Sequence, residues 1–429
     1  MSDAITAFLE DTGNFRYPPG LDRMRRLLHA LGDPQDKLRF VHVAGTNGKG
    51  STCACLDSVL RAAGYRTGLY TSPHIFSYCE RIRVDGACIP EDALATLLAQ
   101  LRPIVDAMPE PPTTFERITA AGFLYFAQQH CDIVVLEVGL GGRFDATNVI
   151  RAPEVAVITP IGLDHTSILG STVAAIAREK AGIVKPGTEV VSAAADEEAD
   201  AVIRDTCLAV GCPLYEAEPQ RLTALRYSLT GTELTVAPYG ALHLPLLGVY
   251  QPRNALTALT ALERLRARGW RIEPRHIAAG LSNVVWEGRF ERLRAAPDFL
   301  LDGAHNPHGI AAAAQSLQTY YPGRKIVFLL GVLADKDVGE MLSPLLPLAE
   351  RFVLTAPPSA RALSAQALGG QLTARGGQWE AYASVERAVA RALTLAGRDG
   401  IVCALGSLYF SGDVRKAVAA QEVCCDVSE

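Results

Sequence analysis

The sequence of 429 residues predicts an α/β fold in which a doubly wound parallel sheet is followed by a second, smaller α/β unit. Short apolar runs of strand length alternate with segments of helical periodicity along most of the chain. A glycine-rich loop joins one of these runs to a helix, and a second series of strands and helices begins after Ala296. We therefore predict two domains, residues 1–296 with the glycine-rich loop and residues 297–429 as a smaller Rossmann-like unit without such a loop.

The composition limits the classes of protein that the chain can represent. Hydrophobic residues make up 49% and charged residues 20%, which is typical of a soluble globular protein. The net charge is −5 and no long basic run offsets it, so we expect no nucleic-acid partner. We also expect no secretory signal and no membrane span, since no apolar run approaches the ~18 residues that a span needs. Ten scattered cysteines without a C-x-x-C pair indicate reduced thiols in a cytoplasmic protein, which we expect to be monomeric.

The central stretch is residues 38–63, which combine a strand, a glycine loop and a helix. The apolar run at 40–43 predicts a buried strand, and the helix that follows is expected to end near Gly64. N–H groups at a helix N-terminus attract phosphate, a loop lysine adds positive charge, and a hydroxyl there suits Mg²⁺. The spacing departs from the standard G-x-x-x-x-G-K-[ST] loop, and an ordinary tight turn is the alternative. The residues expected at the phosphates are Asn47, Gly48, Lys49, Gly50 and Ser51.

Periodicity predicts the other elements in chain order. The first domain is expected to have helices at 21–31, 91–105, 118–130, 197–210 and 251–268. Its further strands are expected at 66–71, 132–138, 155–159 and 190–192, with a short β excursion at 226–236. The second domain is expected to have strands at 299–301, 325–330, 351–354 and 401–405, with helices between them. The run at 132–138 is apolar throughout, as in a central parallel strand, whereas the segment from 75 to 83 is expected to be a mobile loop.

Polar residues follow several predicted strands directly. Ser72, Glu137 and the pair Asp164 and His165 lie at or just beyond strand ends, as the glycine loop does. Because the carboxyl ends of parallel strands meet at one edge of a sheet, we expect these residues to gather there. A carboxylate at the end of an apolar strand, as at Glu137, is costly unless a cation compensates it. Mg²⁺, which prefers oxygen ligands and accompanies phosphate, is the expected cation.

The loop sequence resembles that of a known family. GTNGKGS at 45–51, preceded by VHVAG, resembles the signature of the Mur ligase superfamily, and its combination with TSPH at 71–74 is similar to folylpolyglutamate synthases and dihydrofolate synthases. Further matches run from Gly20 to about Arg415. The resemblance implies a Mur-ligase-like P-loop domain and a Rossmann-like glutamate-ligase domain. It implies ATP-dependent addition of L-glutamate to dihydropteroate, to (poly)glutamylated tetrahydrofolate, or to both, through an acyl phosphate with release of ADP and phosphate.

The resemblance also implies roles for individual residues. It assigns Mg²⁺ to Ser72, Glu137 and His165, and a carbamate to Lys180, whose alternative is a surface lysine paired with a glutamate. Lys49, Lys180 and His305 are the residues implied in catalysis. The residues implied at ATP, besides the loop, are Asn254, Arg289 and Asp302. The residues implied at the pterin or folate are Thr113, Thr114, Phe115, Glu116, Phe144, Asp145 and Ala146.

Several alternatives stay open at this point. The side chain of Phe115 is expected either to stack on the heterocycle of the substrate or to pack in the core. One alternative is that the chain is a Mur ligase that acts on a peptidoglycan nucleotide precursor. The GTNGKGS form and the single small C-terminal domain disfavour this alternative. A P-loop regulatory ATPase that couples a nucleotide to a partner protein is disfavoured because Glu137, His165 and Lys180 would then be coincidences.

Overall fold

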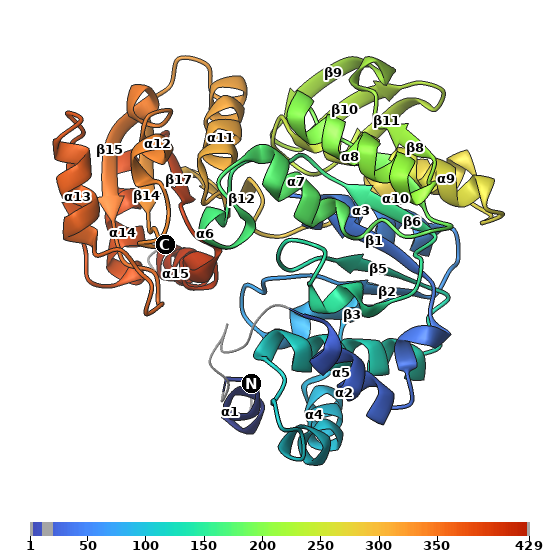
Figure 1. Ribbon diagram of the computed structural model, residues 1–429. Coiled ribbons are helices and arrows are strands. Elements are labelled where there is room, and N and C mark those ends of the chain that lie inside the picture. Colours follow the sequence, from blue (N-terminus) through green and yellow to red (C-terminus); the bar gives the residue numbers. More distant parts are fainter. Residues whose placement is uncertain (1–2, 11–19, 427–429) are drawn as a thin grey trace. The chain divides into compact units, whose positions relative to one another are not determined.

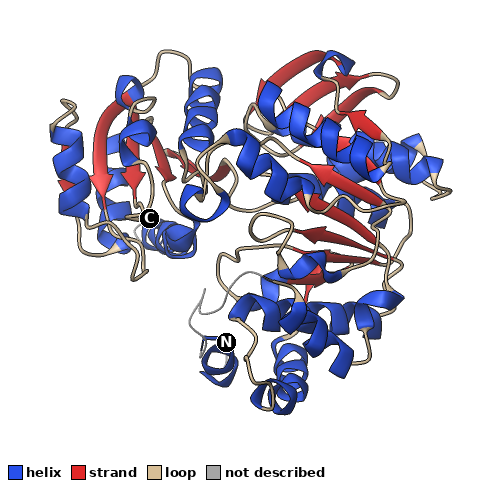
Figure 2. Cartoon of the chain, in the orientation of Figure 1, coloured by secondary structure: helices blue, strands red, loops and turns tan. Residues whose placement is uncertain are grey.

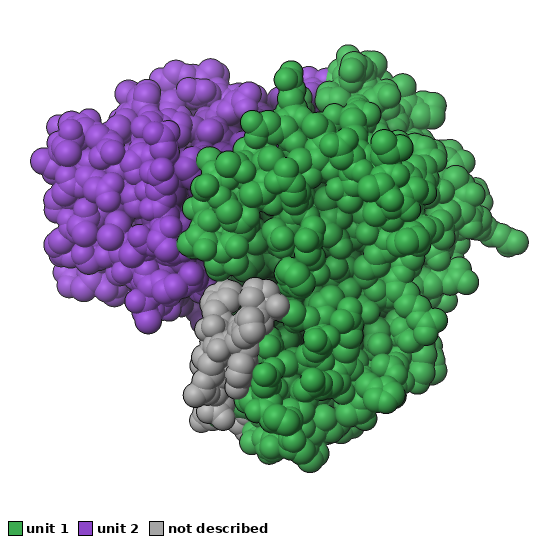
Figure 3. All heavy atoms as spheres, in the orientation of Figure 1, with its two compact units in different colours: residues 1–224, 234–244, 252–284 green, residues 225–233, 245–251, 285–429 purple. Residues whose placement is uncertain are grey.

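The computed structural model describes residues 3–10 and 20–426, which contacts divide into two units (Figure 3). The first unit comprises residues 1–224, 234–244 and 252–284, and the second comprises residues 225–233, 245–251 and 285–429. The predicted boundary after Ala296 falls in the turn of a β-hairpin of the second unit. The division into two domains at that residue stays a prediction.

An eight-stranded sheet forms the centre of the first unit (Figures 1 and 2). Its strands are β1 (Phe40–Ala44), β2 (Thr67–Tyr70), β3 (Ile82–Val84), β4 (Ala87–Cys88), β5 (Ile133–Glu137), β6 (Val155–Ile158), β7 (Glu189–Ser192) and β8 (Leu214–Glu216). Across the sheet the order is β4-β3-β2-β5-β1-β6-β7-β8, parallel except for β3 and β4. Strands β2 to β5 lie on one side of β1, and β6 to β8 lie on its other side. The direction in which successive strands are added therefore reverses at β1. A doubly wound sheet binds ligands beside such a reversal.

The helices of the first unit lie on the faces of this sheet or pack on other helices (Figure 1). They are α1 (Asp3–Glu10), α2 (Asp22–Ala30), α3 (Lys49–Ala62), α4 (Glu91–Asp106), α5 (Thr114–Gln128), α6 (Thr166–Leu169), α7 (Val173–Ala181), α8 (Glu197–Val210), α9 (Gln251–Ala267) and α10 (Pro274–Ser282). Apolar side chains of α1, α2, α4 and α5 form one core with Phe40 of β1 and Leu136 of β5. Helix α3 contacts β1, β2 and β5 without joining that core and packs against α10, which places α3 on the opposite face.

Most predicted elements of the first unit are confirmed. Strands β1 and β5 are buried at every position, as their apolar runs predict. Helix α3 ends before Gly64, whose positive φ of 87° stops the helix. The expectation of a mobile loop between 75 and 83 was wrong, because Tyr78–Arg81 form a 3₁₀ helix that leads into β3. The Glu80 carboxylate fixes this segment by accepting hydrogen bonds of 2.6–2.8 Å from three successive N–H groups, those of residues 75, 76 and 77.

The second unit has its own mostly parallel sheet. Its strands are β12 (Glu291–Ala295), β13 (Asp298–Leu301), β14 (Ile326–Leu330), β15 (Ala349–Leu354), β16 (Trp379–Ala381) and β17 (Ile401–Leu405), in the order β12-β13-β17-β14-β15-β16. Its helices are α11 (Pro307–Tyr320), α12 (Val338–Leu342), α13 (Ala365–Thr373), α14 (Val385–Ala396) and α15 (Ser411–Asp426). Only β12 pairs antiparallel. This arrangement confirms the predicted Rossmann-like partner of the P-loop sheet.

A small antiparallel sheet follows the first sheet in the chain. It consists of β9 (Leu222–Ser228), β10 (Gly231–Val236) and β11 (Gly240–Leu244), in the order β11-β10-β9. The β excursion predicted at 226–236 is therefore present and longer than expected. Within residues 3–10 and 20–426, no helix has both the length and the apolar character of a membrane-spanning segment.

Candidate active site

The phosphate loop makes a turn that only glycine fits at two positions. Gly45 and Gly48 have positive φ angles of 150° and 87°. A Cβ atom on Gly45 would overlap the Thr159 hydroxyl, and one on Gly48 would overlap the side-chain oxygen of Asn254. The loop is therefore pressed against the end of β6 and against helix α9, and Asn254 lies at the loop, where a nucleotide residue was predicted.

Hydrogen bonds to the segment after β6 fix the first half of the loop. The N–H groups of Thr46 and Asn47 both donate to the Pro160 carbonyl, at 3.0 and 3.3 Å, and the Thr46 hydroxyl donates to the Gly162 carbonyl. The backbone N–H of Asn47 is thus already used within the protein. The amides of residues 49–51 start α3 and have no carbonyl one turn earlier in the helix to bind, so they suit an anion.

Two lysines converge on the same loop. Lys49 Nζ donates to the carbonyl oxygens of Gly45 and Thr46, at 3.0 and 3.1 Å. Lys180 Nζ, from the last turn of α7, donates to the Gly45 carbonyl at 2.8 Å. The alternative of a surface lysine is excluded, because Lys180 is only 5% exposed.

The environment of Lys180 favours its neutral amine. Burial lowers the pKa of Lys180 to about 7, and the positive charge of Lys49 contributes in the same direction. The carboxylates of Asp164 and Asp145 act in the opposite direction. A neutral amine is the nucleophilic form of lysine, so this residue is chemically prepared to react near neutral pH.

Glu137 and Ser72 meet at the carboxyl end of adjacent strands. Glu137 ends β5 and is 4% exposed, and one of its carboxylate oxygens accepts the Ser72 N–H at 3.0 Å. Burial raises the pKa of the Cys53 thiol on α3, and the negative charge of Glu137 adds to this rise. The Glu137 carboxylate therefore acts on the helix that follows the phosphate loop. The sheet edge therefore brings a buried carboxylate and a hydroxyl residue to the vicinity of the loop.

His165 stands at the start of α6, after β6. Its backbone has a positive φ of 50°, and its N–H donates to the Asp164 carboxylate at 2.9 Å. The imidazole is 37% exposed and its Nε2 lies 3.9 Å from the same carboxylate. Asp164, whose side chain is 10% exposed, is a further, half-buried carboxylate of this edge, and it acts electrostatically on Lys180.

These residues fit a Mg²⁺ ion shared with phosphate better than a metal site made of protein alone. Among the described residues, no three or more His, Cys, Asp or Glu side chains form a group suited to a metal. The predicted set has only two such ligands, Glu137 and His165, together with the Ser72 hydroxyl. Mg²⁺ usually takes one or two carboxylates and completes its shell with water and substrate phosphates.

Three of the predicted substrate residues make structural hydrogen bonds within the protein. Thr113 and Glu116 form a capping box at the start of α5, in which each side chain bonds to the backbone N–H of the other residue. Glu116 also accepts from Arg23 at 3.3 Å, and the Thr114 hydroxyl donates to the Leu9 carbonyl. The T-x-x-E spacing was the signal that could have revealed this cap in the sequence.

The aromatic residues predicted at the substrate differ in exposure. Phe115 packs against Gly139 and lies edge-on to Tyr70, with ring centroids 6.2 Å apart, so its ring is partly in the core. Phe144, in the loop after β5, is 48% exposed. Ala146, two residues later, is buried.

Asp145 belongs to a buried network that the sequence did not reveal. Its carboxylate accepts the N–H of Leu140 at 2.8 Å, and the N–H and hydroxyl of Thr147 at 3.0 and 2.5 Å. His42 Nε2, buried in β1, lies 2.9 Å from the Thr147 hydroxyl. The single proton of the Thr147 hydroxyl is donated to Asp145, so its oxygen is left to accept from His42 Nε2. Burial lowers the pKa of His42, which favours the neutral ring. This relay fixes the loop that carries Phe144.

The second unit brings together three of the predicted residues. Asp302 follows β13 and is 2% exposed; its oxygens accept the Tyr250 hydroxyl at 2.9 Å and the Ala304 N–H at 2.8 Å. Burial raises the pKa of Asp302, and the positive charge of Arg289 opposes that rise. Arg289 lies across Gly303, where a Cβ atom would overlap its guanidinium. His305 Nδ1 lies 2.8 Å from the Gly303 carbonyl.

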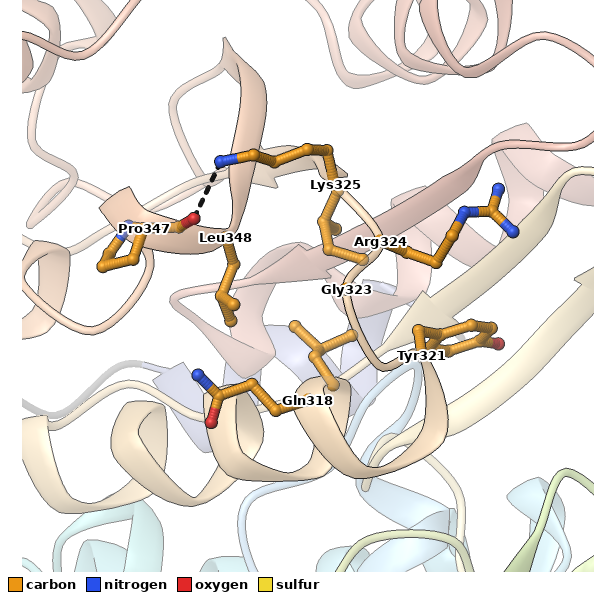
Figure 4. A pocket seen from close by; sticks show the side chains of 9 residues that line it. Gln318, Tyr321, Gly323, Arg324, Lys325, Pro347 and Leu348 are labelled. Atoms are coloured by element: carbon orange, nitrogen blue, oxygen red, sulfur yellow. Dashed lines mark hydrogen bonds between the residues drawn. The ribbon is translucent and has the colours of Figure 1, made fainter.

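A cavity of about 210 Å³ lies elsewhere in the second unit (Figure 4). Lys325, at its edge, donates to the Pro347 carbonyl at 2.9 Å. The cavity adjoins the amino end of β14, whereas Asp302 follows the carboxyl end of β13 in the same parallel sheet. It contains none of the predicted site residues.

Two family models match the chain and together span both units of the fold. The Mur ligase middle domain matches residues 43–262, and the Mur ligase glutamate ligase domain matches residues 288–408. These two domain matches and the fold therefore define an ATP-dependent ligase of the Mur type.

Similar proteins and solved structures identify a group within the Mur ligases. The chain is 37% identical to the dihydrofolate synthase/folylpolyglutamate synthase of Bacillus subtilis, over 94% of this chain and 95% of the relative, and 34% identical to that of Escherichia coli, over 97% and 95%. A Mycobacterium tuberculosis folylpolyglutamate synthase with ADP and AMPPCP superposes with a TM-score of 0.88 at 33% identity, covering 96% of this chain and 98% of the other. E. coli FolC with DHPP and ADP gives a TM-score of 0.85 at 32% identity, covering 97% of each chain. The chain belongs to the folylpolyglutamate synthase and dihydrofolate synthase group of the Mur ligase family, which supports the ligase over both alternatives above.

Proposed function

We propose that this ligase joins L-glutamate to dihydropteroate, to (poly)glutamylated tetrahydrofolate, or to both. The observation that carries the proposal is the convergence of Lys49 and Lys180 on the Gly45 carbonyl, within a phosphate loop that adjoins buried Glu137. The names of the similar proteins supply the substrate class.

The proposed reaction has two steps. A substrate carboxylate oxygen attacks the γ-phosphorus of ATP, the bond to the β-phosphate oxygen breaks, and an acyl phosphate and ADP result. The glutamate amine then attacks the acyl carbon, loses a proton and displaces phosphate. Charge accumulates on phosphate oxygens in the first step, so positive charge from Lys49 and Arg289 is the expected catalytic contribution, together with positioning, in which His305 approaches the γ-phosphate.

Mg²⁺ would be held by Ser72, Glu137 and His165, whose donors fit a site completed by phosphate. When bound, the ion neutralises charge on the transferred phosphoryl group. We assign nucleotide contacts to residues 47–51, Asn254, Arg289 and Asp302. We assign the pterin or folate to Phe144 and Phe115, with Thr113, Thr114, Glu116, Asp145 and Ala146 shaping the same loops. We further propose a cytoplasmic monomer without nucleic-acid or membrane partners.

Lys180 is proposed to carry a carbamate, because its pKa of about 7 supplies the neutral amine that CO₂ requires. At a fixed concentration of dissolved CO₂, reactivation of CO₂-depleted enzyme should speed up as pH rises to about 7 and then level off. With the ordinary lysine pKa of ~10.4, the rate would instead rise about tenfold per unit through pH 9. The measurement is the reactivation rate between pH 6 and 9, and a steady rise through pH 9 would contradict the lowered pKa.

The substrate proposal is tested by ADP release from purified protein with Mg²⁺, ATP and L-glutamate. Dihydropteroate and tetrahydrofolate are supplied separately, and omission of L-glutamate is the control. Release with both acceptors identifies a bifunctional synthase, and release with one identifies the single activity. No release with either acceptor, from folded protein that binds ATP, would refute the folate proposal.

A further inference from the structure

The loop after β5 is docked on the turn that carries Lys180. The Arg143 N–H donates to the Glu179 carbonyl at 2.8 Å. A Cβ atom on Gly142 would lie 2.6 Å from the same carbonyl oxygen, and one on Gly182 would lie 2.5 Å from the Arg143 Cβ. The two backbones therefore touch on both sides of Lys180, at glycines that leave no room for a side chain.

One buried side chain joins the two segments. Asn148 is 6% exposed, and its Nδ2 donates to the Arg143 carbonyl and to the Gly182 carbonyl, both at 3.0 Å. Two facing carbonyl oxygens fix the orientation of the amide, because its oxygen would be repelled there. Lys185 supports the same junction by donating to the carbonyls of Asn148 and Ile150.

The bond to Gly182 acts two residues from Lys180. Lys180 reaches the Gly45 carbonyl at 2.8 Å, from the end of a helix of only nine residues. The last turn of a short helix frays unless other contacts hold it. We propose that Asn148 is a positioning residue for Lys180, because its amide clamps the end of α7 to the loop after β5 and so keeps the amine at the phosphate loop.

This inference rests on the proposed role of Lys180 in ligation. It assigns the effect of Asn148 to its two N–H donors rather than to its volume. The amide oxygen Oδ1 has no hydrogen-bond partner among the described residues, so the donors are the part of the side chain that bonds to protein. An aspartate has nearly the same shape and no donors when ionised, which separates donation from filling of space.

The experiment compares Asn148→Asp and Asn148→Ala with the wild type and with Asn283→Ala. Asn283 is the matched control, since its amide also donates to a carbonyl, that of Ala279 at 2.8 Å, but at an exposed helix end. We measure kcat and KM for ATP well below the unfolding temperature, and the rate at which an amine reagent labels Lys180 in CO₂-depleted buffer. Both Asn148 variants should lose at least about tenfold in kcat with KM for ATP within about twofold, and Lys180 should be labelled several times faster. Asn283→Ala should match the wild type.

Results that differ from these expectations would contradict either the clamp by Asn148 or the role of Lys180. Normal kcat in Asn148→Asp, with a loss only in Asn148→Ala, would show that the side chain merely fills space. Unchanged Lys180 labelling, or ATP binding lost in parallel with kcat, would refute the clamp. Lys180→Ala distinguishes failure of the proposed Lys180 role from failure of the Asn148 clamp. Normal ligation in Lys180→Ala would refute the role of Lys180. Lost ligation in Lys180→Ala together with normal ligation in Asn148→Asp would refute the clamp alone.

Discussion

Replacing Lys49 by alanine should abolish ligation while the protein stays folded. The Lys49 ammonium is held at the start of α3 by the carbonyls of Gly45 and Thr46, so it is pre-positioned where the helix N-terminus attracts phosphate. Loss of one such positive group from a phosphoryl-transfer site costs on the order of 10²–10³ in rate. ADP release measured with L-glutamate and the acceptor should therefore fall to near background.

The change also removes a charge that acts on Lys180. Without Lys49, the pKa of Lys180 should rise from about 7, because a like charge has been taken away. Lys37→Ala is the control, as Lys37 is exposed in the same unit. Normal turnover in folded Lys49→Ala would overturn the assignment of this loop to phosphate.

The fold was predictable where complete burial leaves a continuous apolar run in the sequence. Strands β1, β5 and β17 are buried at every residue, so their apolar runs identify them without tertiary information. Strands β12 and β16 were missed because both are edge strands with partly exposed residues, and a short, half-polar segment has no distinctive pattern. The expected boundary after Ala296 separates β12 from β13, which pair through a turn that the sequence did not reveal.

The site was predictable to the extent that its residues follow strands directly. Glu137, Ser72 and the phosphate loop reach one sheet edge because adjacent parallel strands end there. The residues that hold this chemistry in place were not predictable. The His42 contact to Thr147 joins positions 105 residues apart, and the Asn148 contact to Gly182 joins positions 34 apart. Such contacts depend on how loops pack, which periodicity does not encode.

Replacing Glu137 by glutamine should raise the Mg²⁺ requirement and lower kcat with little loss of stability. Glutamine keeps the shape of the side chain and an oxygen for the Ser72 N–H, but it removes the negative charge that a hard cation prefers. Because a buried carboxylate is costly without a cation, its neutralisation should leave the free energy of unfolding unchanged or slightly higher. The half-saturating Mg²⁺ concentration should increase about tenfold or more, and kcat at saturating Mg²⁺ should fall by about 10²-fold.

Glu116→Gln supplies the matched control for this second prediction. Glu116 is similarly buried, at 5% exposed, but its carboxylate caps α5, and glutamine is an accepted member of a capping box. The same isosteric change should therefore leave Mg²⁺ dependence unaltered at Glu116 and shift it at Glu137. The measurement is ADP release against Mg²⁺ concentration, with thermal unfolding of each variant. Equal Mg²⁺ curves for wild type and Glu137→Gln would show that this carboxylate does not serve the metal, and the half-buried Asp164 beside His165 would be the next ligand to test.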